Sequence, residues 1–215
     1  HWTSKWRARP TKNKMFLYNK MTPAEYGEWL QIGSIVTNAK GGKSAPITEY
    51  GNTKPAHWKS QEAMHAVLEP GAYNEPNATR VNLMLRLTEE QEKSLQELDN
   101  WCLDYAIQNS ERLFGKPLPA EQVKTRYVPC VKTSDMYPST IRVKMNLTGL
   151  GATRFWNSNG HRVAAPQKWR GSTVNACIRL KSLWFMPSQF GIVLDLTDAQ
   201  VTEAPEVCPF WHPSA

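Results

Sequence analysis

Three stretches of the chain alternate apolar and polar residues with a period of two, and this alternation constrains the fold more than any other feature. It runs through Thr79–Leu87 and Thr140–Thr148, and it continues for longer in Thr173–Phe185. A period of two places every second side chain on the same face, so each stretch predicts a half-buried strand. Residues 186–188 then predict a turn into a further strand over residues 190–196, which gives an antiparallel hairpin.

A long helix is expected between the first of these strands and the others. Thr88 followed by Gln91 is the pattern of a capping box, in which both side chains bond to the backbone at the start of a helix. Apolar residues then recur at helical spacing as far as Phe114, and Gly115 and Pro117 predict the end of the helix. A continuous helix of about seven turns would cover this span.

Weaker patterns predict the minor elements. A capping residue followed by proline at Thr22-Pro23 indicates a short helix that ends by Gly33. Brief strands are expected within residues 34–37, 63–68 and 123–132, with loops around the first two. Residues 154–171 show no period and predict an irregular loop rich in cations and aromatic rings.

These elements together predict a mainly β fold with one long helix. Five or so antiparallel strands fit a small closed or partly open barrel better than a doubly wound sheet, which needs more alternation of strands and helices. We divide the chain into a basic, aromatic N-terminal arm with the short helix (residues 1–33), the barrel domain (residues 34–200) and a C-terminal tail (residues 201–215).

Charge is distributed in blocks along the chain. The net charge of +7 is the sum of +7 over residues 1–60, −5 over 61–120, +9 over 121–190 and −4 over 191–215. The third block has eleven Lys and Arg against two acids, and aromatic residues are interleaved with them: Tyr127, Tyr137, Phe155, Trp156, Trp169, Trp184, Phe185 and Phe190. Cations that follow phosphates and rings that accept unstacked bases favour a groove for single-stranded nucleic acid. A solvated coat of lysines is the simpler alternative.

The candidate binding residues fall into two groups. Strand patterns place a first group of cations on the sheet: Lys124, Arg126, Arg142, Lys144, Arg179 and Lys181. The irregular loop contributes a second group that would close over the bound strand: Arg154, Phe155, Trp156, Arg162, Lys168, Trp169 and Arg170.

Patterns for catalysis or metal binding are scarce. Metal-dependent nucleases need several converging carboxylates, and the basic block offers only Glu121 and Asp135. The four cysteines are far apart and include no Cys-x-x-Cys pair, and Cys102 and Cys177 are expected to be buried free thiols. We therefore expect a non-enzymatic protein with no cofactor and no structural metal.

Hydropathy indicates no membrane partner. No apolar run approaches the roughly 18 residues that a membrane span needs, and the first residues form no apolar signal segment. The expected location is intracellular, in the cytoplasm or nucleus of a host cell, and not secreted.

The order of the elements adds a resemblance to a known family. Val81–Phe114 is followed by Val123–Leu147, and then by Ala176–Phe185 running into Phe190–Leu194. Over about half of the chain, this order resembles the OB-fold single-stranded-DNA-binding proteins of phages and large DNA viruses. The resemblance implies an OB-like antiparallel barrel that coats unwound DNA strands in replication and recombination, with little base specificity, and that contacts replication proteins.

Two other classes of protein also fit the sequence. A viral coat or nucleocapsid protein would likewise join a basic arm to a β-rich body, and a strand-annealing or nucleic-acid-processing enzyme would share the basic surface. RNA as a partner stays open, because the choice between DNA and RNA depends on contacts to a 2′-hydroxyl. A homo-oligomer stays open as well.

Overall fold

The structure, a computed structural model, describes residues 23–71 and 78–205. Its helices are α1 (Pro23–Trp29), α2 (Glu89–Gln108), α3 (Ser110–Phe114) and α4 (Ala120–Arg126). Its strands are β1 (Leu30–Ile32), β2 (Val36–Thr37), β3 (Lys43–Glu49), β4 (Ala56–Lys59), β5 (Met64–Ala66), β6 (Arg80–Arg86), β7 (Tyr127–Val128), β8 (Val131–Lys132), β9 (Thr140–Asn146), β10 (Arg154–Trp156), β11 (Arg162–Val163), β12 (Thr173–Phe185) and β13 (Phe190–Thr202). The prediction of a mainly β fold with one long helix is confirmed.

The three strands predicted from clean alternation are present, at β6, β9 and β12. The predicted hairpin is also confirmed, since β12 pairs with β13 along its whole length. Most of the N-terminal arm (residues 1–22) and the end of the tail (residues 206–215) lie outside the described residues. Tyr26, Leu30 and Ile32, from the described part of residues 1–33, are buried in the main core.

Five strands pair in a closed circuit. β12 pairs with β5, β5 with β6, β6 with β9, β9 with β13, and β13 returns to β12. Four of these pairings are antiparallel and the β9–β13 pairing is parallel, so the expectation of a wholly antiparallel arrangement is wrong. The reason is geometric, because neighbouring strands cannot all alternate in direction around a circuit with an odd number of members.

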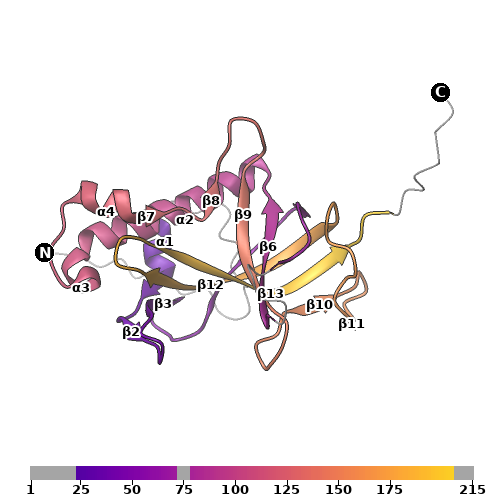
Figure 1. Ribbon diagram of the computed structural model, residues 1–215, viewed down its shortest axis with the longest axis horizontal. Helices are drawn as coiled ribbons and strands as arrows, with labels where there is room; N and C mark the ends of the chain where they lie inside the picture. Colours follow the sequence, from indigo (N-terminus) through magenta and orange to yellow (C-terminus); the bar gives the residue numbers. More distant parts are fainter. Residues whose placement is uncertain (1–22, 72–77, 206–215) are drawn as a thin grey trace, which may run out of the picture.

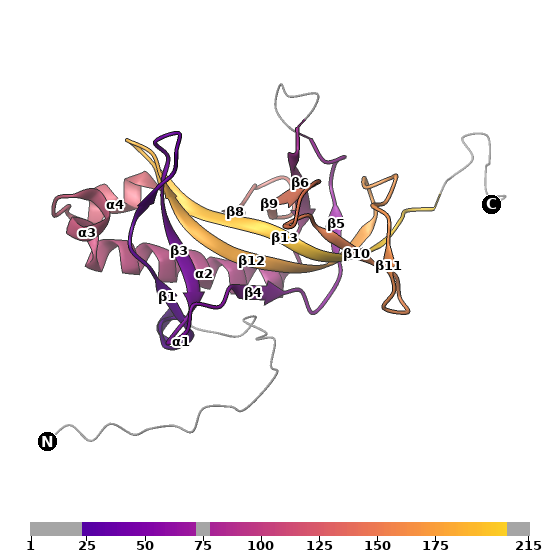
Figure 2. The same cartoon turned by 90° about the horizontal axis from the view of Figure 1, so that it is seen from below.

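Helix α2 lies alongside the long β12–β13 hairpin and closes the core (Figures 1 and 2). Its N-terminus has the predicted capping box, in which Thr88 and Gln91 each bond to the other's backbone. Leu95 and Leu98 are fully buried. The indole nitrogen of Trp58 also donates to Ser94 Oγ over 3.2 Å, which ties α2 to β4.

The helix is not continuous to Phe114 as predicted. It is interrupted at Asn109, which has φ −117° and ψ 27°, and α3 follows. Asn109 Nδ2 donates to the backbone oxygen of Tyr105 over 2.9 Å, and such bonds from asparagine compete with the helical pattern. Gly115 ends α3 in the left-handed conformation at φ 73°, as the glycine predicted.

The strand expected over residues 123–132 is wrong, because its first part is the helix α4. Val123 is fully buried in a small second core around Phe190, and Tyr127, four residues further on, packs against the same core. That spacing matches one face of a helix better than one face of a strand. Only β7 and β8 remain of the expected strand. Further strands lie where loops were expected, at β3, β4, β10 and β11.

A buried carboxylate fixes the chain after α4. Asp99 of α2 accepts hydrogen bonds from the Tyr127 hydroxyl (2.5 Å) and from the backbone nitrogens of Cys130 (2.9 Å) and Val131 (3.2 Å). Burial raises the pKa of Asp99, and these hydrogen bonds oppose the rise. The Asp99 carboxylate therefore accepts backbone hydrogen bonds here that a backbone carbonyl oxygen accepts elsewhere in the sheet.

Replacing Asp99 by alanine is expected to destabilise the fold by at least about 2 kcal/mol, because three donors would lose their acceptor in a buried place. Urea unfolding followed by circular dichroism measures the change. Asp104→Ala, at an exposed position of the same helix, is the control and should change stability by less than about 0.5 kcal/mol. Equal effects of the two substitutions would contradict this role of Asp99.

Candidate nucleic-acid interface

The face of the sheet opposite the core carries a row of polar residues across five strands. Directly paired residues share a face of a sheet. In successive register the partners are Asn82 of β6, Lys144 of β9, Asp195 of β13, Arg179 of β12 and His57 of β4. We call these five residues the central row and this side of the sheet the outer face.

Four cations surround one carboxylate in the central row. Asp195 is buried, with 4 % of its surface exposed, and its Oδ2 lies 2.9 Å from Lys181 Nζ. Arg80 forms a second ion pair with the same carboxylate, and Lys144 and Arg179 are its register partners. Four positive side chains minus one carboxylate leave a net charge of +3. We call Arg80, Lys144, Arg179, Lys181 and Asp195 the cation cluster.

Two nitrogen atoms of the cluster lack a partner in the part of the protein that the structure describes. The Nε atoms of Arg80 and Arg179 are buried, and neither has a hydrogen-bond partner there. Burial lowers the pKa of Lys144, and the positive charges of Arg80 and Lys181 lower it further against the opposing effect of Asp195. An anion placed over the cluster would relieve this repulsion.

A second group on the outer face combines cations with an aromatic ring. Arg154 Nε lies 2.8 Å from Asp198 Oδ1, and the Trp156 indole nitrogen donates to the same oxygen over 2.9 Å. The Arg154 guanidinium lies 5.9 Å from the centroid of the Trp156 ring, and Arg162 of β11 is the register partner of Trp156. The ring is therefore held in one orientation while remaining partly exposed.

Asp198 anchors this group electrostatically. Burial alone would raise the pKa of Asp198, but hydrogen bonds from Arg154, Trp156 and Thr197 outweigh burial and hold the pKa below its ordinary value. The carboxylate thus stays charged at neutral pH. It fixes both Arg154 and Trp156 in the free protein.

Seven of the residues predicted from the sequence lie on the outer face: Arg142, Lys144, Arg154, Trp156, Arg162, Arg179 and Lys181. The others are placed elsewhere. Lys124 and Arg126 belong to α4 and not to the sheet, and Lys124 Nζ is 2.8 Å from Glu121 Oε1. Lys168 and Arg170 are exposed in a loop whose backbone is held by Glu69.

Burial corrects the interpretation of two aromatic residues. Phe155 and Trp169 were expected to close over a bound strand, but they are 8 % and 4 % exposed. Their rings pack edge to face with centroids 5.8 Å apart. The cause at Phe155 is its position in β10, since neighbours along a strand point to opposite faces and Trp156 takes the outer one. Trp2 and Trp6, two aromatic residues of the N-terminal arm, lie outside the described residues.

The sequence interpretation missed several cations of this face. Arg80 and Arg86 occupy the polar positions of β6, and the same alternation that identified Arg142 and Lys144 could have found them. His57 and Lys59 had no such pattern, because β4 is a short strand within a stretch expected to form loops.

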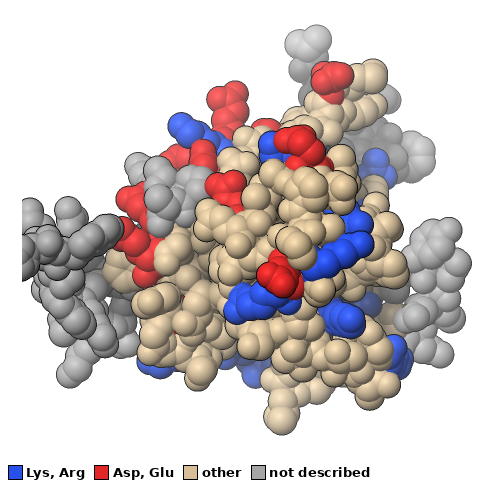
Figure 3. Space-filling view, turned by 90° about the vertical axis from the view of Figure 1, so that its left-hand side faces the viewer, with Lys and Arg blue, Asp and Glu red and all other residues tan. Residues whose placement is uncertain are grey.

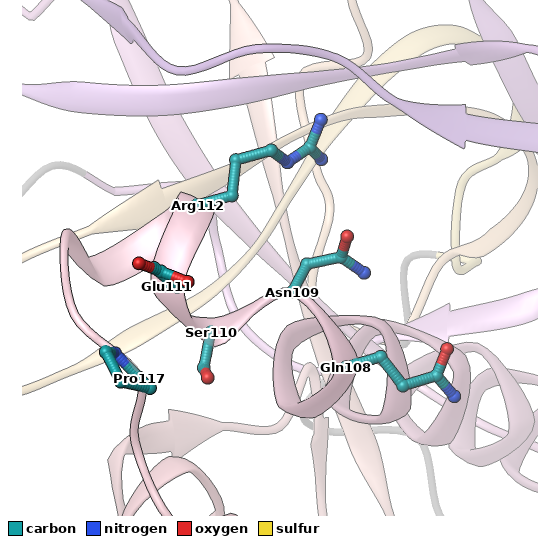
Figure 4. A pocket seen from close by; sticks show the side chains of 6 residues that line it. All are labelled: Gln108, Asn109, Ser110, Glu111, Arg112 and Pro117. Atoms are coloured by element: carbon teal, nitrogen blue, oxygen red, sulfur yellow. The ribbon is translucent and has the colours of Figure 1, made fainter.

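The end of the molecule formed by α3 and α4 carries charges of both signs (Figures 1 and 3). Figure 3 shows Lys and Arg side chains there mixed with Asp and Glu side chains, which gather along the upper left margin. A shallow depression of about 500 Å³ lies at the junction of α2 and α3, lined by Gln108, Asn109, Ser110, Glu111, Arg112 and Pro117 (Figure 4). Arg112 donates to the backbone oxygen of Ile32 over 3.3 Å and to the Tyr105 hydroxyl, so its guanidinium is already engaged.

No three His, Cys, Asp or Glu side chains in residues 23–71 and 78–205 lie together as metal ligands would. No helix in those ranges is both long and apolar enough to cross a membrane.

Comparison with known proteins places the chain in a family. Residues 74–212, about two thirds of the chain, match the model of a family of unknown function, DUF5871. The chain belongs to this family. The DUF5871 match includes β6, β9, β10, β12 and β13, and so all residues of the cation cluster. No curated protein sequence matches the chain.

Solved structures of phage proteins are similar to this chain over most of its length. The single-stranded DNA-binding protein of bacteriophage Enc34, solved in complex with ssDNA, is 12 % identical with a TM-score of 0.46, and the match covers 83 % of this chain and 98 % of that one. Another structure of the Enc34 protein is 14 % identical with a TM-score of 0.45, and the match covers 86 % of this chain and 96 % of that one. Bacteriophage T7 gp2.5, a single-stranded DNA-binding protein, is 12 % identical to this chain with a TM-score of 0.47, and the match covers 75 % of this chain and 100 % of that one. The resemblance to phage proteins of this class, stated from the order of elements, is found again.

Proposed function

We propose that this protein binds single-stranded DNA on the outer face of β6, β9, β12 and β13, with little dependence on base sequence. The observation that carries the proposal is the cation cluster, in which two cations form ion pairs with one buried carboxylate and two more are its register partners. Phosphate groups are the natural partners for such an excess of charge, because every nucleotide brings one. The proposal rests on this surface.

Trp156 is the reason to propose single strands over duplex. A partly exposed indole beside the cations offers its face to an unpaired base, and such stacking is tolerant of base identity. Bases inside a duplex are already stacked on one another and do not offer that contact. The outer face thus combines the two kinds of contact that single-strand binding uses.

The closed circuit of five strands supports the further proposal that the platform is an OB-like barrel. A protein that coats unwound strands this way would act inside the cell in DNA replication and recombination, without catalysing a reaction itself. The N-terminal arm, the loop cations Lys168 and Arg170, and the helix cations Lys124 and Arg126 would add contacts beyond the outer face.

A competition titration tests the proposal. Fluorescence anisotropy with labelled oligo-dT, competed by unlabelled oligo-dT, oligo-U and duplex DNA, should rank oligo-dT well above duplex. Binding of oligo-dT should also weaken steeply as salt rises, because counterions are released from each contacted phosphate. Duplex binding as tight as oligo-dT binding would refute the single-strand proposal, and a preference for oligo-U would assign RNA instead.

Acidification is expected to tighten binding through His57 of the central row. Burial and the charge of Arg179 lower the pKa of His57, and the Pro55 carbonyl, Asp198 and Glu49 only partly offset them. His57 is therefore mostly neutral at neutral pH, and a bound phosphate would favour its charged form. We expect oligo-dT to bind a few-fold more tightly near pH 5.5 than near pH 7.5, in a range around the ordinary histidine pKa of about 6.5.

His57→Gln provides the comparison for this pH dependence. All other histidines are the same in both proteins, so the difference between the two pH profiles isolates His57. The variant should lose most of the gain in affinity on acidification while binding normally at pH 7.5. The same pH profile in both proteins would rule out His57 as the titrating group.

A further inference from the structure

An exposed aromatic ring lies beyond the end of the outer face that is remote from Trp156. The loop of residues 133–138 between β8 and β9 carries Met136 and Tyr137, which are 81 % and 70 % exposed. Figure 1 shows this loop standing out from the body above β9, whereas the β10–β11 hairpin lies at the opposite end of that strand. A tyrosine exposed to this extent adds little to the core, but its flat ring is available to a ligand.

The base of this loop is fixed to the sheet on both sides. Lys132 of β8 is the register partner of Thr140 at the start of β9. The backbone oxygen of Ser139 accepts a hydrogen bond from the backbone nitrogen of Leu87 over 2.9 Å. Tyr137 therefore stands two residues from an anchored position, which limits how far its ring can move from the end of the outer face.

Cations continue along the outer face from the cation cluster to this loop. Arg142 follows Lys144 on the same face of β9, and Arg86 and Lys132 flank Thr140, the next position along. Arg86, Lys132 and Arg142 are all exposed. From Asn146 to Thr140 this path along β9 spans roughly 20 Å, at about 3.4 Å per residue.

We propose that Tyr137 stacks on a base at one end of the bound strand. The strand then follows β9 from the β10–β11 hairpin, where Trp156 lies, across the cation cluster to the β8–β9 loop. This inference rests on the proposed function, and it adds the course of the strand and a second stacking residue.

Removal of the ring should weaken binding in a way that depends on oligonucleotide length. OB-fold sites occupy from about 4 to about 16 nucleotides. An oligo-dT of about 4 nucleotides would therefore cover one end of the path, whereas one of about 16 nucleotides would cover all of it. Tyr137→Ala should lose about tenfold in affinity for the longer oligonucleotide and less than about twofold for the shorter one, because a short strand binds without reaching the loop. Tyr137→Phe should restore the affinity, since the stacking face is kept.

Tyr50→Ala is the matched control, because Tyr50 is similarly exposed (66 %) in the turn between β3 and β4. It should bind both oligonucleotides as the wild type does. Circular dichroism should show all three variants folded, as expected for exposed positions. Equal losses for Tyr137→Ala at both lengths, or no loss at the longer length, would overturn the inference.

Two further outcomes are distinct from these. If Tyr137→Ala changes sedimentation of the protein but leaves the affinity for the longer oligo-dT intact, the ring serves a contact between proteins and the inference fails. If the wild type does not bind oligo-dT at either length, the proposed function itself fails. Binding by the wild type together with length-dependent loss in Tyr137→Ala supports both.

Discussion

Replacing Lys144 and Arg179 together by glutamine is expected to lower the affinity for oligo-dT about 25-fold at about 0.1 M salt. Each phosphate contact on a single strand contributes about 0.7 to the slope of log affinity against log salt concentration. Two contacts contribute about 1.4 to this slope. Between about 1 M and about 0.1 M salt they therefore raise the affinity of the wild type by a factor of about 25 that the variant lacks. The variant should therefore also show a slope shallower by about 1.4.

Lys93→Gln supplies the control for this double variant. Lys93 is an exposed cation of α2, away from the outer face. Its removal changes the net charge of the protein but no proposed contact, so both the affinity and the slope should stay close to the wild type. An unchanged slope in the double variant would mean that Lys144 and Arg179 do not contact phosphates.

Replacing Asp195 by asparagine is expected to change DNA binding and stability in opposite directions. The carboxylate is the one acid of the cation cluster, and it lies against Lys181 and Arg80. Asparagine leaves those cations without their partner and raises the net charge of the cluster by one unit. We expect oligo-dT to bind about tenfold more tightly, which corresponds to about 1.4 kcal/mol.

Stability should fall in the same variant, because removing one partner of a buried ion pair costs about 3–5 kcal/mol when the other charge stays buried. Lys181 and Arg80 keep 39 % and 35 % of their side chains exposed, so water will lower this cost. Thermal unfolding with and without oligo-dT measures both effects. Asp104→Asn, at an exposed site on α2, should change neither. Weaker DNA binding by Asp195→Asn would show that the carboxylate organises the site more than it repels the ligand.

The strands that build the site could be predicted where one face of a strand is buried and the other is solvated. β6, β9 and β12 have long alternating patterns, so the sequence also indicates that Lys144 and Arg179 point away from the core. β4 contributes His57 and Lys59 but has only four residues, too few for a period to stand out from its neighbours. Short strands are specified by their partners, and those partners are distant in the sequence.

The choice between buried and exposed aromatic rings could not be made from neighbouring residues. Phe155 and Trp156 are adjacent and have the same cationic surroundings, yet one is buried and the other lies on the outer face. The register of β10 against β13 decides between them, and that register depends on long-range pairing. A signal for it would have been a recognisable β10 strand, which the irregular sequence of residues 154–171 conceals.

The convergence of the cations on Asp195 also lies beyond the reach of local patterns. Asp195 is 51 residues from Lys144 (195 minus 144), and the two become partners only because β9 and β13 are neighbouring strands of the sheet. Arg80 comes from a third part of the chain. Asp195, which the sequence places in the negatively charged block of residues 191–215, lies at the centre of the basic site.

Mapping of photo-cross-links between oligo-dT and the wild-type protein tests the central claim most directly. After ultraviolet irradiation and proteolysis, mass spectrometry identifies the peptides that carry nucleotide. Cross-linked peptides should come from β9, from the β10–β11 hairpin around Trp156 and from β12 around Arg179. Cross-links confined to α2, α3 and α4, with none on these strands, would contradict the assignment of the outer face as the DNA-binding surface.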